Sequence, residues 1–164
     1  LEVSRLQSGQ MKFEKESCSV KELVDDLYLA HQLLVPTHLR FSKEAEGDLF
    51  IYTDKKRLSQ VITNFLTNAC KFTNSGYIKL GFKHLRGTDE AAIFVEDSGI
   101  GLSEEEQEKV FSRFFKQDEF SQGAGLGLSI CQGIVQNLGG RIALSSKLGK
   151  GSRFSVVLPV YKGG

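Results

Sequence analysis

The chain has 164 residues, of which 40% are hydrophobic and 25% are charged, as is typical of a single soluble domain with a real core. Lysine and arginine number 21 against 20 aspartates and glutamates, so the net charge of +1 argues against general attraction to nucleic acid or to an anionic membrane. No apolar run approaches the ~18 residues of a membrane span, no signal peptide is evident, and the 3 widely spaced cysteines predict reduced thiols of a cytosolic domain.

The N-terminal part of the chain predicts two helices. The first ten residues, LEVSRLQSGQ, have the pattern of the last turns of a helix that ends at Gly9, because glycine favours the left-handed conformation just past a helix. Ser19 and Glu22 have the spacing of a capping box and predict a second helix that runs to about Val35, before a proline. Its expected apolar stripe is Leu23, Leu27, Leu33 and Leu34.

Two short strands and a long helix are expected next. The strands are residues 38–43 and 49–53, joined by a polar turn at 46–48. Residues 54–72 form the most regular helical pattern in the chain, because the apolar side chains recur three or four positions apart. These side chains are Leu58, Val61, Ile62, Phe65, Leu66, Ala69 and Phe72.

The second half of the chain mixes strands with helices. A polar, glycine-containing stretch at 116–125 is long enough to be mobile. The interspersed order, with hairpins, predicts the α+β class, with one mixed sheet and helices on one face. The expected elements are strands at 77–85 and 91–96, a short acidic helix capped by Ser103 and Glu106, a helix at 126–138, and strands at 141–145 and 153–158.

Three polar side chains on the long helix form the first candidate site. At ~100° per residue, Asn68 lies about 40° from Asn64, and Lys71 lies about 20° to the other side, so all three share one narrow stripe. Asn68 offers a carbonyl oxygen to a hard cation such as Mg²⁺, and Lys71 offers a charge to phosphate. The alternative is a solvated helix edge, although two asparagines inside a helix give up helix propensity for no structural gain.

The turn DSGIG, which begins at Asp97, forms the second candidate site. Ile93, Val95 and Asp97 alternate onto one face of a strand, and if that face is the inner one, the carboxylate needs a hydrogen-bond donor. The exocyclic amine of adenine is such a donor, whereas guanine presents a carbonyl oxygen there. Gly99 and Gly101 would let the backbone approach a flat base. An ordinary Asp-Gly turn is the alternative.

Two further groups precede the helix at 126–138. GAGLGLS, at 123–129, opens that helix and would offer free N–H groups to phosphates, but it is not a P-loop because no Gly-Lys-Ser/Thr follows. FSRFFK, at 111–116, interleaves three phenylalanines with Arg113 and Lys116. It is either ordinary core with solvated charges or an anchor that presents cations to a triphosphate.

Taken in order, these groups resemble the GHKL ATPase superfamily and, within it, the histidine kinases. TNFLTNACKFT resembles the asparagine box of that family, DSGIG the first glycine box, VFSRFFKQ the phenylalanine box, GAGLGLSI the second glycine box, and GKGSRF the closing glycine motif. The resemblance implies a Bergerat-type two-layer α/β sandwich with a mixed sheet of about five strands and a mobile ATP lid around residues 116–124.

The resemblance also implies roles for individual residues. The implied catalytic residues are Asn64, Arg113 and Lys116, and the implied Mg²⁺ ligand is Asn68. The implied nucleotide-binding residues are Asn64, Asn68, Lys71, Asp97, Gly99, Gly101, Gly123, Gly125, Leu126, Gly127, Leu128 and Ser152.

Within the superfamily, the chain resembles the kinases more than the ATPases. The ATPases have a Glu one helical turn before the metal-ligating asparagine, where it activates water, and the residue here is Asn64, which cannot take a proton. The implied function is transfer of the γ-phosphate of ATP, with Mg²⁺, to a histidine upstream of this chain. A GHKL ATPase and a nucleotide-binding module without phosphotransfer are the alternatives.

The resemblance implies a domain division and partners. Residues 1–16 are expected to be the end of the preceding dimerisation and phosphoacceptor helix with its linker, and residues 17–162 the catalytic domain. The expected partners are the protein's own helical hairpin, within a homodimer, and a response-regulator receiver domain, with no nucleic acid and no membrane contact by this piece. We expect a cytoplasmic domain, whose parent chain can be anchored in the inner membrane. His31, His38 and His84 lack the acidic residue that follows a phosphorylated histidine in this family.

Overall fold

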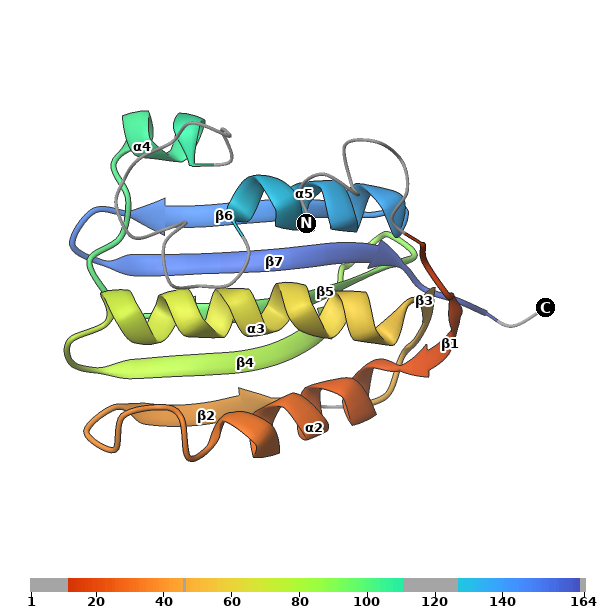
Figure 1. The fold of residues 1–164 in the computed structure, drawn as a ribbon, viewed down its shortest axis with the longest axis horizontal. Coiled ribbons are helices and arrows are strands. Elements are labelled where there is room, and N and C mark those ends of the chain that lie inside the picture. The colour runs from red at the N-terminus through yellow and green to blue at the C-terminus, as the bar shows by residue number, and fades with distance from the viewer. Residues whose placement is uncertain (1–11, 46, 111–126, 163–164) are drawn as a thin grey trace.

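The structure is a computed structural model that describes residues 12–45, 47–110 and 127–162. A five-stranded mixed sheet has the order β2-β4-β5-β7-β6, in which only the β2–β4 pair among these strands is parallel (Figure 1). This sheet confirms the predicted α+β class. Its strands are β2 (Arg40–Glu44), β4 (Tyr77–His84), β5 (Glu90–Asp97), β6 (Arg141–Lys147) and β7 (Gly151–Pro159).

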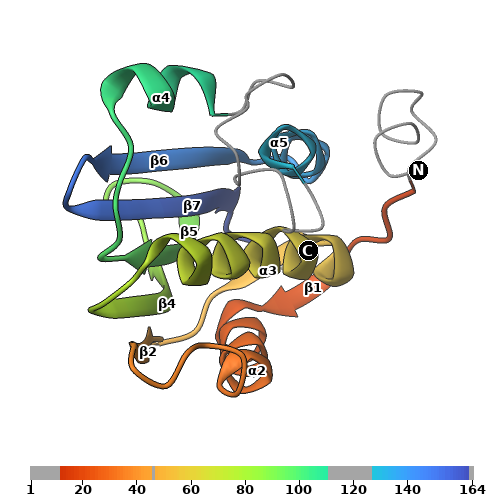
Figure 2. The ribbon, with the colours of Figure 1, turned by 60° about the vertical axis from the view of Figure 1, so that its left-hand side comes forward.

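Three helices form a second layer on one face of the sheet, as Figure 2 shows from the side. They are α2 (Val20–His31), α3 (Lys55–Phe72) and α5 (Leu128–Asn137). The short helix α4 (Glu104–Lys109) lies apart from them, near the edge strand β6 (Figures 1 and 2). The predicted arrangement of helices on one face is therefore confirmed.

Helix α3 lies across the middle of the sheet because its apolar residues share one face. The residues from Leu58 to Ala69 that were expected to be apolar core are all almost fully buried. Asp54 caps the helix, and its carboxylate accepts hydrogen bonds from the backbone N–H groups of Arg57 and Glu14.

Helix α2 is shorter than predicted. Ser19 caps it as expected, with the side chain accepting from the Glu22 N–H at 3.1 Å, but the helix ends at His31. The N–H groups of Leu34 and Val35 both bond to the carbonyl of His31 in a turn before the proline, since a residue preceding proline disfavours helical geometry.

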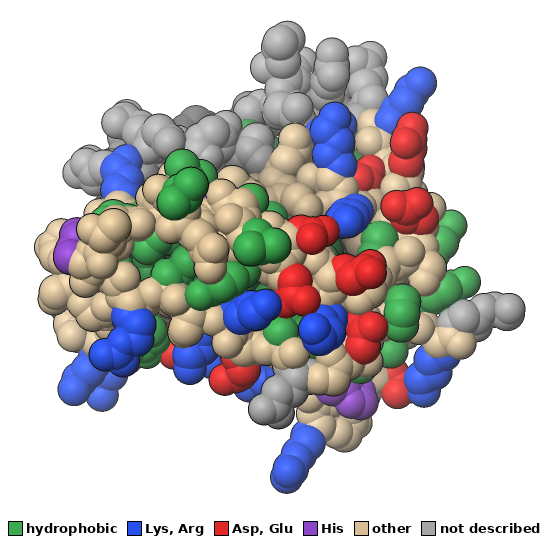
Figure 3. All heavy atoms as spheres, turned by 90° about the horizontal axis from the view of Figure 1, so that it is seen from below, with side chains coloured by type: hydrophobic (Ala, Val, Ile, Leu, Met, Phe, Trp, Pro, Cys, Tyr) green, Lys and Arg blue, Asp and Glu red, His purple; other side chains and the backbone are tan. Residues whose placement is uncertain are grey.

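The early end of α2 changes the environment of two leucines. Leu33 and Leu34, predicted to belong to the buried stripe, are 97% and 70% exposed, so that part of the prediction is wrong. Figure 3 shows the molecule from below, where apolar side chains are exposed among charged ones.

The two short strands predicted at 38–43 and 49–53 exist but lie in different sheets. The first is β2, and the second is β3 (Phe50–Thr53), which pairs antiparallel with β1 (Glu16–Ser19) in a small separate sheet. Strand β1 was not predicted, because of its four residues only Cys18 is buried and no apolar alternation marks it. His38, expected in a strand, lies in the turn before β2.

The remaining expectations concern the cysteines and the N-terminal residues. The helix end predicted at residues 1–10 lies outside the described residues. Cys18, Cys70 and Cys131 are free thiols, as predicted. Within the described residues, no helix is both long and apolar enough to cross a membrane.

Candidate nucleotide-binding site

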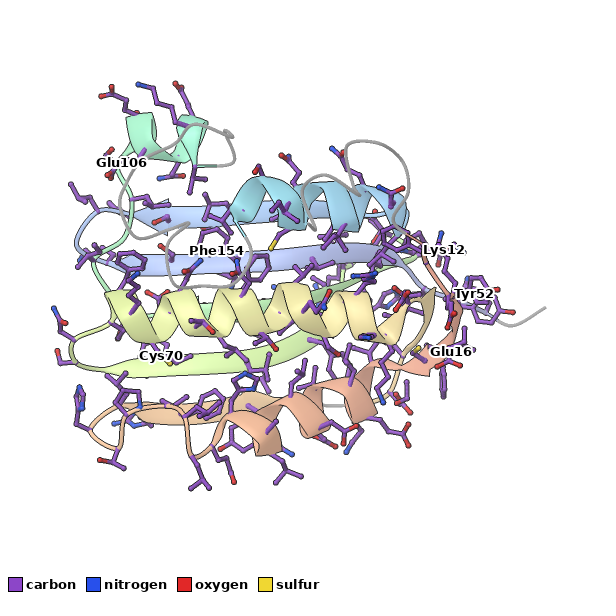
Figure 4. The ribbon with its side chains drawn as sticks, viewed as in Figure 1. Lys12, Glu16, Tyr52, Cys70, Glu106 and Phe154 are labelled. Carbon is purple, nitrogen blue, oxygen red and sulfur yellow. The ribbon has the colours of Figure 1, made fainter. Side chains whose placement is uncertain are left out.

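A narrow pocket opens between α3 and the ends of β5 and β7. Its wall is mostly apolar and includes the rings of Phe65 and Phe154, whose centroids lie 5.2 Å apart; Figure 4 labels Phe154 on β7. A mostly apolar wall with a few polar groups is typical of a small-molecule site. The polar side chains in the lining are Asn68, Asp97 and Ser152.

Asp97 lies at the end of β5 with its side chain in the pocket. It shares the inner face of the sheet with the buried Ile93 and Val95, as the alternation predicted, and is only 8% exposed. Burial raises the pKa of its carboxyl group, whereas hydrogen bonds from the backbone N–H groups of Gly99, at 2.8 Å, and Ser152 act to lower it. A buried carboxylate held in this way is an acceptor for an amine donor.

Asn64 and Asn68 are buried on the inner side of α3. They are 1% and 4% exposed, which excludes the alternative of a solvated helix edge for both asparagines. The Asn64 Nδ2 donates to the Sγ of Cys131 on α5 at 3.5 Å, and burial raises the pKa of that thiol to about 12, so it remains neutral. Lys71, the third member of the predicted stripe, is exposed.

The two asparagines carry buried polar atoms that the described part of the chain does not pair. These atoms are the Oδ1 of Asn64 and both the Oδ1 and the Nδ2 of Asn68. Burying an unpaired amide costs free energy, so natural proteins rarely retain one without a function or a bound ligand. The Oδ1 of Asn68 is a neutral oxygen ligand of the kind that suits a hard cation such as Mg²⁺.

The structure explains why the DSGIG turn requires glycine at two positions, which the sequence did not indicate. A Cβ at Gly99 would lie 2.3 Å from the carbonyl oxygen of Phe72, and one at Gly101 would lie 2.1 Å from that of Lys147. Gly101 also has a φ of +70°, which disfavours other residues. Both glycines are therefore required by the close approach of protein backbone, and their approach to a base stays a prediction.

Hydrogen bonds missed by the sequence analysis hold this turn against β6. The Ser146 hydroxyl accepts from the N–H of Leu102, and Gln107 on α4 donates to the carbonyl oxygens of Leu102 and Ser146. Only the register of β6 against β7, which places Ser146 opposite Ser152, could have indicated this role for Ser146.

Of the residues predicted to bind phosphate near the start of α5, the structure describes only Gly127 and Leu128. Gly127 is the N-cap of α5 and makes no side-chain cap, and Leu128 is the buried first residue of that helix. The predicted residues Arg113, Lys116, Gly123, Gly125 and Leu126, and the predicted lid at 116–124, lie outside the described residues.

The fold is a two-layer α/β sandwich with a pocket between the layers. Residues 53–162 match the family described as histidine kinase-, DNA gyrase B-, and HSP90-like ATPase, and the chain belongs to this family. This confirms the resemblance inferred from the five motifs.

The relatives of this chain include sensor proteins, among them sensor histidine kinases. Over 98% of its length, the chain is 39% identical to the alginate biosynthesis sensor protein KinB of Pseudomonas aeruginosa and 35% identical to the sensor histidine kinase RcsC of Escherichia coli. The chain spans 27% and 18% of the length of these two relatives. The catalytic domain of the histidine kinase ThkA is similar in structure, with a TM-score of 0.77 and 29% identity over 91% of this chain and 96% of that one.

Proposed function

We propose that this chain is the ATP-binding catalytic domain of a sensor histidine kinase, and that it transfers the γ-phosphate of ATP to a histidine upstream of its own sequence. The observation that carries the proposal is a buried carboxylate, Asp97, in the pocket, together with buried amide atoms on α3 that no described residue pairs. These atoms are the Oδ1 of Asn64 and the Oδ1 and Nδ2 of Asn68. The family and the sensor kinases among its relatives support the same function.

In this proposal, the pocket beside Phe154 holds adenine. Its exocyclic amine donates to the Asp97 carboxylate, which is buried and therefore selects a donor over an acceptor. Ser152 and Gly101 line the same pocket, and we assign close approach to the base to Gly99 and Gly101. This arrangement favours adenine over guanine, because the two bases differ at that position in donor and acceptor.

The triphosphate would extend along α3 towards the N-terminus of α5. Asn68 would hold Mg²⁺ through its Oδ1, and Mg²⁺, when bound, neutralises charge on the phosphate oxygens. Asn64 and Lys71 would contact phosphate, together with the helix opening at Gly127 and Leu128. From the second glycine box, we assign phosphate contacts to Gly123, Gly125 and Leu126. From the phenylalanine box, we assign stabilisation of the transferring phosphoryl group to Arg113 and Lys116.

The residue at position 64 favours phosphotransfer over hydrolysis. An amide cannot accept a proton from water, and the buried neighbour of Asn64, the Cys131 thiol, is neutral because its pKa is raised to about 12. Water therefore lacks a general base among these groups, and the γ-phosphate is retained for a better-placed nucleophile. A GHKL ATPase and a module without phosphotransfer remain the competing functions.

The acceptor and the partners follow from the same proposal. We assign residues 1–16 to the end of the phosphoacceptor helix and its linker, and 17–162 to the catalytic domain. Two of the three histidines make poor acceptors: His31 is buried with its Nδ1 2.8 Å from the carbonyl oxygen of Leu27, and the Nε2 of His38 lies 2.9 Å from the carbonyl oxygen of Asn74. ThkA, 26% identical, has been solved in complex with a response regulator protein, which supports a receiver domain as the downstream partner.

The proposal is tested by γ-labelled ATP in three reactions: the chain alone, the helical hairpin of its parent protein alone, and both together. Acid-labile label is expected on the hairpin in the mixture only, at a slow rate because the covalent tether that raises the effective concentration is absent. The Asp97→Asn variant is the matched control and should transfer little. Acid-labile label on the chain alone would contradict the acceptor assignment, and rapid phosphate release would favour an ATPase.

A further inference from the structure

A serine that belongs to none of the motifs connects three parts of the pocket wall. The Ser146 hydroxyl oxygen lies 2.8 Å from the backbone nitrogen of Leu102, 3.0 Å from the carbonyl oxygen of Gly151, and 2.8 Å from the hydroxyl oxygen of Ser152. Ser152 is itself buried and lines the pocket together with Asp97. Ser146 therefore contacts a side chain that lines the pocket proposed to hold the base.

The protons of the two hydroxyl groups fix the direction of these bonds. A serine hydroxyl donates one hydrogen bond and accepts up to two. The Gly151 carbonyl can only accept, so its bond uses the Ser146 proton, and the Leu102 N–H can only donate, so it uses a lone pair of Ser146. The contact between the hydroxyls can then form only if Ser152 donates to Ser146. The Ser152 oxygen is left with lone pairs to offer to the pocket.

The surrounding backbone holds Ser146 in this geometry. Gln107 donates from its Nε2 to the carbonyl oxygens of Leu102 and Ser146, at 3.0 Å each. The pairing of β6 with β7 places Ser146 directly opposite Ser152. Two of the three partners of the Ser146 hydroxyl, the Leu102 N–H and the Gly151 carbonyl, are thus backbone groups of fixed position, and these two set the direction of its bond to the third partner, the Ser152 hydroxyl.

We propose that Ser146 is a positioning residue for base recognition. By taking the Ser152 proton, it makes Ser152 a second acceptor beside the Asp97 carboxylate. A purine with an amine at C6 can donate one N–H to each acceptor, whereas a purine with a carbonyl at C6 meets two acceptors. This inference rests on the proposed nucleotide site and adds a specificity determinant to it.

The test compares adenosine diphosphate with inosine diphosphate, which differ at C6, by calorimetry on the chain. In Ser146→Ala, the freed Ser152 proton can turn to the inosine carbonyl, so the ratio of the two affinities should fall by about 3- to 10-fold. Ser146→Thr keeps the hydroxyl and should keep the ratio. Ser145→Ala is the matched control, because Ser145 is the preceding residue of β6 and lies opposite Arg153, not Ser152.

Each outcome decides the inference. An unchanged ratio in a folded Ser146→Ala variant, with or without an equal loss of both affinities, overturns the positioning role. If Ser146→Ala does not fold, Ser152→Ala removes the acceptor itself and must lower the ratio; an unchanged ratio there also overturns the inference. Failure of the wild-type chain to bind either nucleotide would instead remove the proposed function. If Ser146→Ala still binds ADP more tightly than inosine diphosphate, the proposed function remains intact.

Discussion

At the scale of single residues, Asp97 serves binding at the expense of stability. Burial makes its pKa higher in the folded domain than the ordinary value of 3.8. Asp97 therefore contributes most to the stability of the nucleotide-free domain when the pH lies below that ordinary pKa. This contribution is lost as the pH rises through the raised pKa of the folded state. Ionising a carboxyl group in this buried position costs stability, and the proposed gain is its contact with an amine.

The first prediction is that Asp97→Asn separates these two effects. Affinity for ADP should fall by about 10-fold or more, because a bond to a charged acceptor is lost and the new amide adds a competing donor. The nucleotide-free variant should be equally stable or more stable at neutral pH, by up to about 1 kcal/mol. Calorimetry and thermal unfolding measure the two quantities.

Asp26→Asn is the matched control for Asp97→Asn, because Asp26 is an exposed aspartate on α2 with an ion pair to Lys55. Both its ADP affinity and its stability should remain near those of the wild type. Unchanged ADP affinity in Asp97→Asn would contradict the assignment of Asp97 to the base.

The second prediction concerns the metal. Asn68→Ala removes the buried oxygen proposed to bind Mg²⁺, so ADP affinity with Mg²⁺ should fall to the value measured in EDTA. Because no described residue pairs with this amide, its removal should leave the melting temperature unchanged or raise it. Asn137→Ala, at an exposed asparagine of α5, is the control and should keep its response to EDTA. An equal response of Asn68→Ala and wild type would make Asn68 a structural residue only.

At the scale of elements, the end of α2 determines which leucines stabilise the fold. The third prediction is that Leu27→Ala lowers the free energy of unfolding by about 2–4 kcal/mol, because Leu27 is buried in the core beneath α2. Leu34→Ala, a change of the same chemistry at a 70% exposed position, should alter it by less than about 0.5 kcal/mol. Denaturant unfolding measures both, and equal losses would place the end of the helix nearer to Val35.

Local sequence patterns predicted the helices and strands better than they predicted which strands pair with each other. The regular apolar spacing of α3 and the alternation of β4 and β5 are properties of neighbouring residues, so the sequence was sufficient to predict these elements. The pairing of β1 with β3, and the parallel pairing of β2 with β4, join strands far apart in the chain and leave no local signal. Without these pairings, β2 and β3 were expected to be directly connected neighbours.

The candidate site shows the same division. Asn64, Asn68 and Asp97 could be selected because their residue types are unfavourable in their local setting, within a helix or on an apolar face. The structure adds that all three are buried. Ser146 could not be selected, since its role depends on the register of two strands and on the direction of one hydroxyl bond.

At the scale of the whole molecule, the pocket joins the two layers of the sandwich. Asn68 and Phe65 belong to the helical layer, whereas Asp97, Ser152 and Phe154 belong to the sheet. A ligand that contacts both layers binds the folded chain and not the unfolded one. Binding must therefore stabilise the entire domain by mass action.

The last prediction follows from this linkage. At a concentration 100 times its dissociation constant, Mg-ADP should add about 2.7 kcal/mol to the stability of the wild-type chain. For a domain of this size, that gain corresponds to a rise in melting temperature of about 5–10 °C. Asp97→Asn should show a much smaller rise at the same concentration, even though its nucleotide-free melting temperature is unchanged or higher, and inosine diphosphate should act weakly on the wild type. A wild-type chain that shows no shift contradicts the nucleotide site itself. A shift of equal size in Asp97→Asn leaves a nucleotide site but places the base elsewhere, because the carboxylate would then contribute nothing to the bound state.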